Sequence, residues 1–121
     1  MKTEHGFAQR FEDLSIWQTS RTLVGTIYLS FRDLSDFGYR DQIHRAAVSV
    51  MNNIAEGFEQ RSPTNFARYL DIAKASAGEV RSMLYLAEDL SYLNPNQAKE
   101  IRNSYEILSR QIAKFTSTLR K

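Results

Sequence analysis

Asp41 and His44 have side chains and a spacing that could bind a metal ion. They stand three positions apart, the spacing at which metal-binding helical bundles place a carboxylate and an imidazole on one helix face. Such bundles need a second pair of this kind and carboxylates from two further helices. The only other histidine is His5, near the amino terminus. A metal-dependent enzyme using Asp41, His44 and Glu56 stays an alternative, but we expect neither a metal nor a cofactor.

Glu56 and Glu79 are a second candidate pair, since two carboxylates could divide acid and base roles between them. Both are predicted at the interior edges of adjacent helices, where a carboxylate more often makes a structural hydrogen bond. The sequence has no glycine-rich phosphate loop, nucleophile elbow or paired-cysteine motif. We therefore expect no catalytic residue, no enzymatic activity and no small-molecule substrate.

Positive charge gathers near the carboxyl terminus. Residues 99–121 contain six Lys or Arg against two Asp or Glu, whereas residues 1–98 contain ten against twelve. The candidate nucleic-acid-binding residues are Lys99, Arg102, Arg110, Lys114, Arg120 and Lys121. On a helix, four of the six project within about 60° of one another, with Arg102 and Arg120 on one flank and Glu106 interrupting the patch. This face could bind the phosphates of RNA or DNA, or it could be an ordinary solvated face.

Four amphipathic helices must position these residues. Apolar side chains recur at spacings of three and four, which predicts helices over about 13–34, 40–61, 63–93 and 95–119. Ser62-Pro63 and Asn94-Pro95 are start signals, because Ser and Asn cap helices and Pro suits the first helical position. The short connections favour antiparallel neighbours. The prediction is an all-α, up-and-down four-helix bundle, a single domain over residues 1–121 with residues 1–12 partly disordered.

Bulk composition agrees with a small globular domain. The chain has 121 residues, no cysteine and a net charge of only +2, which is too small to indicate nucleic-acid binding by itself. No stretch approaches the roughly 20 apolar residues of a membrane span, and the first ten residues contain no apolar run. We expect a cytoplasmic protein that does not enter a membrane.

The predicted third helix has a wider apolar surface than one core seam requires. Beside its core stripe runs a second series: Tyr69, Ile72, Ser76, Glu79, Met83, Leu86 and Leu90. The first helix is similar, with Trp17 and Tyr28 beside its core line. One interpretation is that inner helices simply bury more surface, and the other is that the excess forms a subunit interface. Small residues on the second helix, such as Ser49, would let another helix come close, or they could face solvent.

Residues 42–93 closely resemble the bacterial four-helix-bundle family encoded by intervening sequences of large-subunit ribosomal RNA genes. The most specific part is Asn53-Ile54-Ala55-Glu56-Gly57, followed by Arg61 and Ser62. Upstream, Phe11, Leu14 and Trp17 match the family's opening. Met51 departs from the family's frequent proline, Ala75 from its glycine, and Val80-Arg81 from its usual Leu-Glu pair.

The resemblance implies a four-helix bundle that forms rings, typically pentamers. A related branch assists a reverse transcriptase in diversity-generating retroelements through a basic nucleic-acid-binding surface. By resemblance, this chain is expected to be a ring-forming accessory factor for structured RNA or DNA; the alternative is a protein-interaction scaffold without a nucleic-acid role. The residues expected to serve packing and assembly are Asn53, Glu56, Gly57, Arg61, Ser76 and Glu79.

Overall fold

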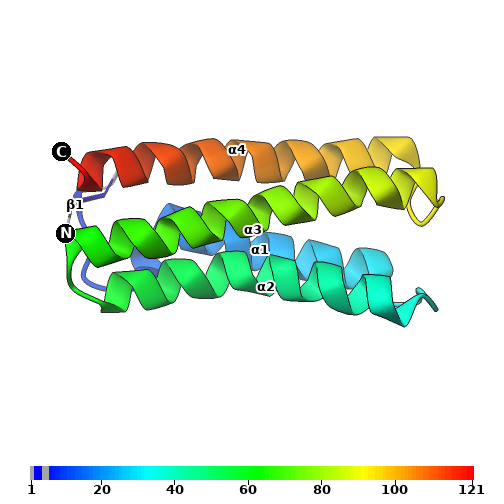
Figure 1. The fold of residues 1–121 in the computed structure, drawn as a ribbon, viewed down its shortest axis with the longest axis horizontal. Coiled ribbons are helices and arrows are strands. Elements are labelled where there is room, and N and C mark those ends of the chain that lie inside the picture. Colours follow the sequence, from blue (N-terminus) through cyan, green and yellow to red (C-terminus); the bar gives the residue numbers. More distant parts are fainter. Residues whose placement is uncertain (1, 4–5) are drawn as a thin grey trace.

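Four long antiparallel helices form the bundle in the computed structural model, which describes residues 2–3 and 6–121 (Figure 1). The elements in chain order are β1 (Lys2–Thr3), β2 (Gly6–Phe7), a 3₁₀ helix η1 (Phe11–Asp13), α1 (Ser15–Phe31), α2 (Phe37–Glu59), α3 (Pro63–Asp89) and α4 (Pro95–Leu119). The two short strands pair antiparallel. The predicted all-α four-helix bundle is confirmed. Part of the disorder expected over residues 1–12 falls on residues 1, 4 and 5, which lie outside the described residues. Residue 5 is His5, one of the two histidines of the sequence.

Consecutive helices are neighbours in space. α2 packs between α1 and α3, and α3 packs between α2 and α4 (Figure 1). α1 closes the bundle against α4 through a sparser interface. This up-and-down arrangement follows from the short connections, which leave each helix only its sequence neighbours as nearest partners.

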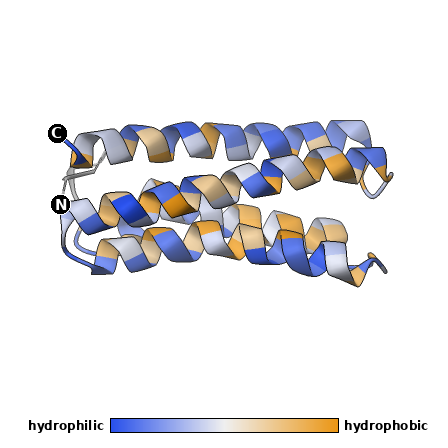
Figure 2. Ribbon diagram, in the orientation of Figure 1, coloured by the Kyte–Doolittle hydropathy of each residue, from blue (hydrophilic) through white to orange (hydrophobic). Residues whose placement is uncertain are grey.

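The core is built from the predicted stripes. Every member of the heptad series on α3 is fully buried: Phe66, Leu70, Ala73, Ala77, Val80, Leu84 and Ala87. α4 contributes Leu108 and Ile112 in the same way, so each helix presents an apolar side to the bundle and a polar side to solvent. Figure 2 shows this mixture of hydrophobic and hydrophilic residues along all four helices. Within the described residues, no helix is both long and apolar enough to cross a membrane.

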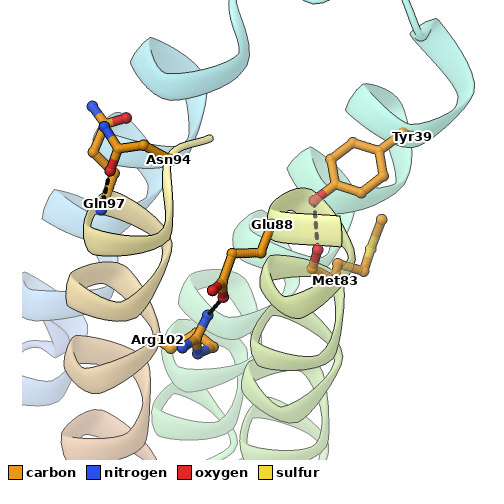
Figure 3. A network of polar contacts seen from close by, with 6 residues as sticks. All are labelled: Tyr39, Met83, Glu88, Asn94, Gln97 and Arg102. Atoms are coloured by element: carbon orange, nitrogen blue, oxygen red, sulfur yellow. Dashed lines mark hydrogen bonds and ion pairs between the residues drawn. The ribbon is translucent and has the colours of Figure 1, made fainter. Parts of the chain in front are cut away.

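Side-chain caps fix where three of the helices begin. Ser62 Oγ accepts a hydrogen bond from the Asn65 amide at 3.3 Å, and Asn94 Oδ1 accepts one from the Gln97 amide at 2.8 Å (Figure 3). Both starts lie where the Pro-containing signals predicted them. α2 instead begins at Phe37, earlier than the predicted position 40, because Asp36 Oδ1 accepts a hydrogen bond from the Tyr39 amide at 3.1 Å.

Left-handed residues end α2 and α3 earlier than predicted. Arg61 has φ 57° and follows the end of α2, and Ser91 has φ 60° and follows the end of α3. At Ser91 the chain forms a Schellman motif, with Tyr92 N–H donating to the Ala87 carbonyl at 2.8 Å and Ser91 N–H to that of Glu88 at 3.1 Å. The predicted continuation to residue 93 is therefore wrong, since the motif reverses the chain.

Tyrosine hydroxyls tie the two turns at this end of the bundle together. Tyr92 Oη donates to Asp36 Oδ2 at 2.5 Å, which joins the α3–α4 turn to the residue that caps α2. Tyr39 Oη donates to the Met83 carbonyl at 2.6 Å (Figure 3). The hydrogen bond from Tyr92, followed by that from the Tyr39 amide, holds the pKa of Asp36 below its ordinary value.

Candidate nucleic-acid interface

Three exposed cations lie on α4, and a fourth follows the end of this helix. They are Lys99, Arg110, Lys114 and Lys121, and within the described residues none of the four forms an ion pair. They project away from the buried Leu108 and Ile112 of the same helix. Lys99 and Lys114 are 15 positions apart on α4, which is about 22 Å at 1.5 Å per residue. We call these four residues the basic face.

Arg102 is held between two α3 residues and does not belong to the basic face. Its guanidinium pairs with the Glu88 carboxylate (Figure 3) and lies 4.1 Å from the centroid of the Tyr85 ring. Only 14% of its side chain is exposed. Arg102 therefore fastens α4 to α3, and its role in binding nucleic acid stays a prediction.

Arg120 is likewise bound to α3. Its Nη1 and Nη2 donate to the two carboxylate oxygens of Asp71 at 3.2 and 2.6 Å. This bidentate hydrogen bonding lowers the pKa of Asp71, and it also raises the pKa of Arg120. The structure thus separates the six predicted residues into four free cations and two that join helices.

Glu106 does not leave a lone negative charge in this region. Its carboxylate lies 4.0 Å from Nη2 of Arg81 on α3. Sequence reasoning missed both Arg81 and Tyr85 as neighbours of the basic face. Their spacing of four positions places these two residues on one face of α3, but nothing in the sequence indicates that this face meets α4.

Gly57 lets α2 and α3 approach closely. A β-carbon at this position would lie 2.6 Å from the Tyr69 β-carbon and 2.8 Å from Phe66 Cδ1. Ala46, on the same side of α2, is 3% exposed. The small residues on α2 therefore accommodate α3 of the same chain.

The remaining motif residues form polar contacts along this interface. Asn53 Nδ2 donates to the Ser49 carbonyl at 2.8 Å and to Ser49 Oγ at 3.0 Å, and the hydroxyls of Ser49 and Ser76 are 2.8 Å apart. Glu79 accepts a hydrogen bond from Gln42 at 3.3 Å. Arg61 takes a different role, since its left-handed backbone follows the end of α2.

Glu56 and Glu79 are not brought together. Glu79 lies beside Gln42, and Gln42 is 14 positions from Glu56 on α2, about 21 Å along the helix. Glu56 instead borders a surface cleft of about 390 Å³ near the end of α2, with Phe11 and Tyr69 among its other lining residues. This separation leaves the two carboxylates unable to share an acid–base reaction within one chain.

His44 packs against an aromatic ring. It stacks on Tyr28 of α1, with ring centroids 3.9 Å apart and planes inclined by 13°. Burial, and then the nearby charge of Arg40, lower the pKa of His44, while Asp41 acts in the opposite direction. In the part of the chain that the structure describes, no group of three or more His, Cys, Asp and Glu residues could hold a metal ion.

The second apolar series on α3 divides into a covered and an exposed part. Met83 is 8% exposed, and Ser76 and Glu79 bond to α2. Three further members remain exposed at 50%, 43% and 47%: Ile72, Leu86 and Leu90. Burial within the chain therefore accounts for only part of the wide apolar surface.

A comparison with known families decides where this bundle belongs. Residues 12–114 match the family described as 23S rRNA-intervening sequence protein. The chain is a member of this family. The match spans η1 to α4 and includes the whole α2–α3 motif region. The predicted family resemblance is thereby confirmed.

A solved structure has the same fold as this family member. It is a Bacteroides thetaiotaomicron protein of unknown function from the S23 ribosomal protein family, with a TM-score of 0.76 and 23% sequence identity. The alignment covers 82% of this chain and 95% of that chain. No curated protein matches the sequence significantly.

Proposed function

We propose that this protein is a non-enzymatic accessory factor that binds structured RNA or DNA through the basic face of α4. The observation that carries the proposal is the set of four exposed cations that form no ion pair within the described residues. Phosphates that bind such a face release condensed counterions, which drives association without reading sequence.

A salt titration tests this function. If all four cations contact phosphates, the logarithm of the binding constant should fall with the logarithm of salt concentration with a slope of about −3.6 per chain. Affinity would then drop about 150-fold between 50 and 200 mM salt. The double variant Arg110→Gln/Lys114→Gln should halve the slope to about −1.8, because two phosphate contacts are lost.

Arg45→Gln/Arg68→Gln is the matched control. It removes the same charge from exposed residues of α2 and α3, which carry no ion pair in the described structure and lie off α4. This control should leave the slope near its original value. Undetectable binding by the unmodified protein at about 50 mM salt, with its oligomeric state intact, would contradict the proposal.

We further propose that the functional form is a homo-oligomer, most consistent with the pentameric ring expected from the family resemblance. The supporting observation is the exposure of Ile72, Leu86 and Leu90 on one helix. A ring would repeat the basic face, so several weak contacts would act as one strong one. By analogy with the retroelement branch, such a ring would assist an enzyme that acts on nucleic acid.

The same apolar residues also favour the alternative of a protein-interaction scaffold. The two proposed functions predict different effects of reversing the charge of basic residues on α4. Under the scaffold function, Arg110→Glu/Lys114→Glu should leave recovery of a protein partner unchanged. Under the nucleic-acid function, the same variant should abolish binding to RNA or DNA.

A further inference from the structure

Tyr85 is an exposed aromatic residue beside the basic face. It is 58% exposed, on the side of α3 that borders α4. Two other exposed aromatic residues in the described chain lie elsewhere: Tyr28 stacks on His44, and Phe37 lies at the start of α2 under the Arg40 guanidinium. Tyr85 therefore differs from them in its position beside α4, the helix that carries Lys99, Arg110 and Lys114.

Three basic residues lie over or near the Tyr85 ring. Arg102 lies over it at 4.1 Å, and Lys99 precedes Arg102 by three positions, which makes the two neighbours on α4. Arg81 lies one helical turn before Tyr85 on α3. Of the nearby carboxylates, Glu88 pairs with Arg102 and Glu106 with Arg81, whereas the exposed Asp89, one helical turn after Tyr85, forms no ion pair within the described residues.

The geometry of Arg102 leaves part of the ring available. A guanidinium lies over one face of an aromatic ring, and the exposed 58% of Tyr85 includes surface that Arg102 does not cover. The ion pair with Glu88 fixes the guanidinium and so orders the ring beneath it. Little side-chain freedom then remains to be lost when a flat ligand stacks on Tyr85.

We infer that Tyr85 is a stacking platform for an unpaired base in a single-stranded segment of a structured RNA whose phosphates lie along the basic face. This inference rests on the proposed function and names its ligand more closely. Base stacking on an ordered aromatic ring next to cations is the usual way in which proteins hold unpaired RNA. A base inside a duplex cannot reach Tyr85, because both of its faces are already stacked.

The test compares single-stranded and duplex RNA. The probes are an oligouridylate of about 12 nucleotides and an RNA duplex of about 12 base pairs, each titrated at fixed low salt. Tyr85→Leu should weaken binding of the oligouridylate about 5- to 100-fold, since one stacked base is lost. It should change duplex binding less than about 2-fold and leave the salt slope unaltered.

Two matched variants isolate the ring. Tyr85→Phe keeps the aromatic face and should retain oligouridylate binding. Phe37→Leu removes another exposed ring that has an arginine over it, at 4.7 Å, but lies away from α4, and should have no effect. The duplex titration also reports whether each variant is still folded.

Failure of this inference is distinct from failure of the proposed function. If Tyr85→Leu binds oligouridylate as the unmodified protein does, while Arg110→Gln/Lys114→Gln still lowers the salt slope, Tyr85 does not stack a base and the basic face still binds. Equal losses for both probes would also overturn the stacking role. If the unmodified protein binds neither probe, both the stacking role of Tyr85 and the proposed function are overturned.

Discussion

Gly57 shows how much of the bundle can depend on one residue. Any side chain there would enter the space of Phe66 and Tyr69, so α2 and α3 could no longer approach as closely. Gly78, inside α3, is the opposite case, since a β-carbon added there would have no neighbouring atom within 4 Å. The same residue type therefore has a packing role in one helix and none in the next.

We predict opposite effects of alanine at these two positions. Gly57→Ala should lower the free energy of unfolding by about 1–3 kcal/mol, because the added methyl group overpacks the interface. Gly78→Ala should raise it by about 0.5–1 kcal/mol, because alanine favours the helix more than glycine. Urea unfolding followed by circular dichroism at one protein concentration measures both. A similar loss of unfolding free energy at the two sites would show that close packing is not the reason why position 57 requires glycine.

The sequence predicted the candidate residues but not their partners. It placed six basic residues near the carboxyl terminus, and four of them form the basic face. Arg102 and Arg120 find carboxylates 14 and 49 positions away, on α3. Helical periodicity gives the direction in which a side chain projects from the axis of its own helix. It does not give the rotation and height of the neighbouring helix, which decide whether a charge is paired.

Helix starts in this protein were easier to predict than helix ends. Ser62 and Asn94 cap through short side chains followed by proline, a pattern visible in the sequence. The ends at Arg61 and Ser91 use left-handed residues that are not glycine, so nothing in the residue type marked them. Gly38 lies in the first turn of α2 and does not end a helix.

Ser91→Gly should therefore stabilise the protein. A left-handed backbone costs a non-glycine residue about 1–2 kcal/mol, and relief of this strain exceeds the extra chain entropy of glycine. We expect the free energy of unfolding to rise by about 0.5–1 kcal/mol.

Ser82→Gly is the control for that prediction, since Ser82 is also exposed but lies within α3. There the change should lower the free energy of unfolding by about 0.5 kcal/mol through lost helix propensity. Thermal or urea unfolding would measure both variants. A destabilised Ser91→Gly protein would contradict the assignment of strain to the Schellman turn.

The whole bundle leaves apolar surface uncovered on α3. α2 covers Met83 and bonds to Ser76, yet Ile72, Leu86 and Leu90 stay about half exposed. An amphipathic helix of an isolated bundle has no need for these residues on its outer side. Their exposure is the observation behind the proposed contact with further copies of the chain.

Disrupting this surface should dissociate the assembly. By light scattering after gel filtration, the unmodified protein should exceed its chain mass of 14.0 kDa, and a pentamer would approach about 70 kDa. Leu86→Ser/Leu90→Ser should shift the mass toward that of one chain. Leu29→Ser/Ile107→Ser changes apolar residues of α1 and α4 that are more exposed than Leu86 and Leu90, and it should leave the mass unchanged. A single 14 kDa species for the unmodified protein would rule out the assembly.

The sparse seam between α1 and α4 has a consequence for how the native bundle opens. α1 has 17 residues against 27 in α3, and its main partner is α2. Detaching α1 exposes less apolar surface than detaching α3, which is packed on both sides, so partial unfolding should begin there. Backbone amides of α1 would then exchange with deuterated water through a local opening, while those of α3 would exchange only through global unfolding. Uniform protection in both helices would instead show that the bundle opens as one cooperative unit.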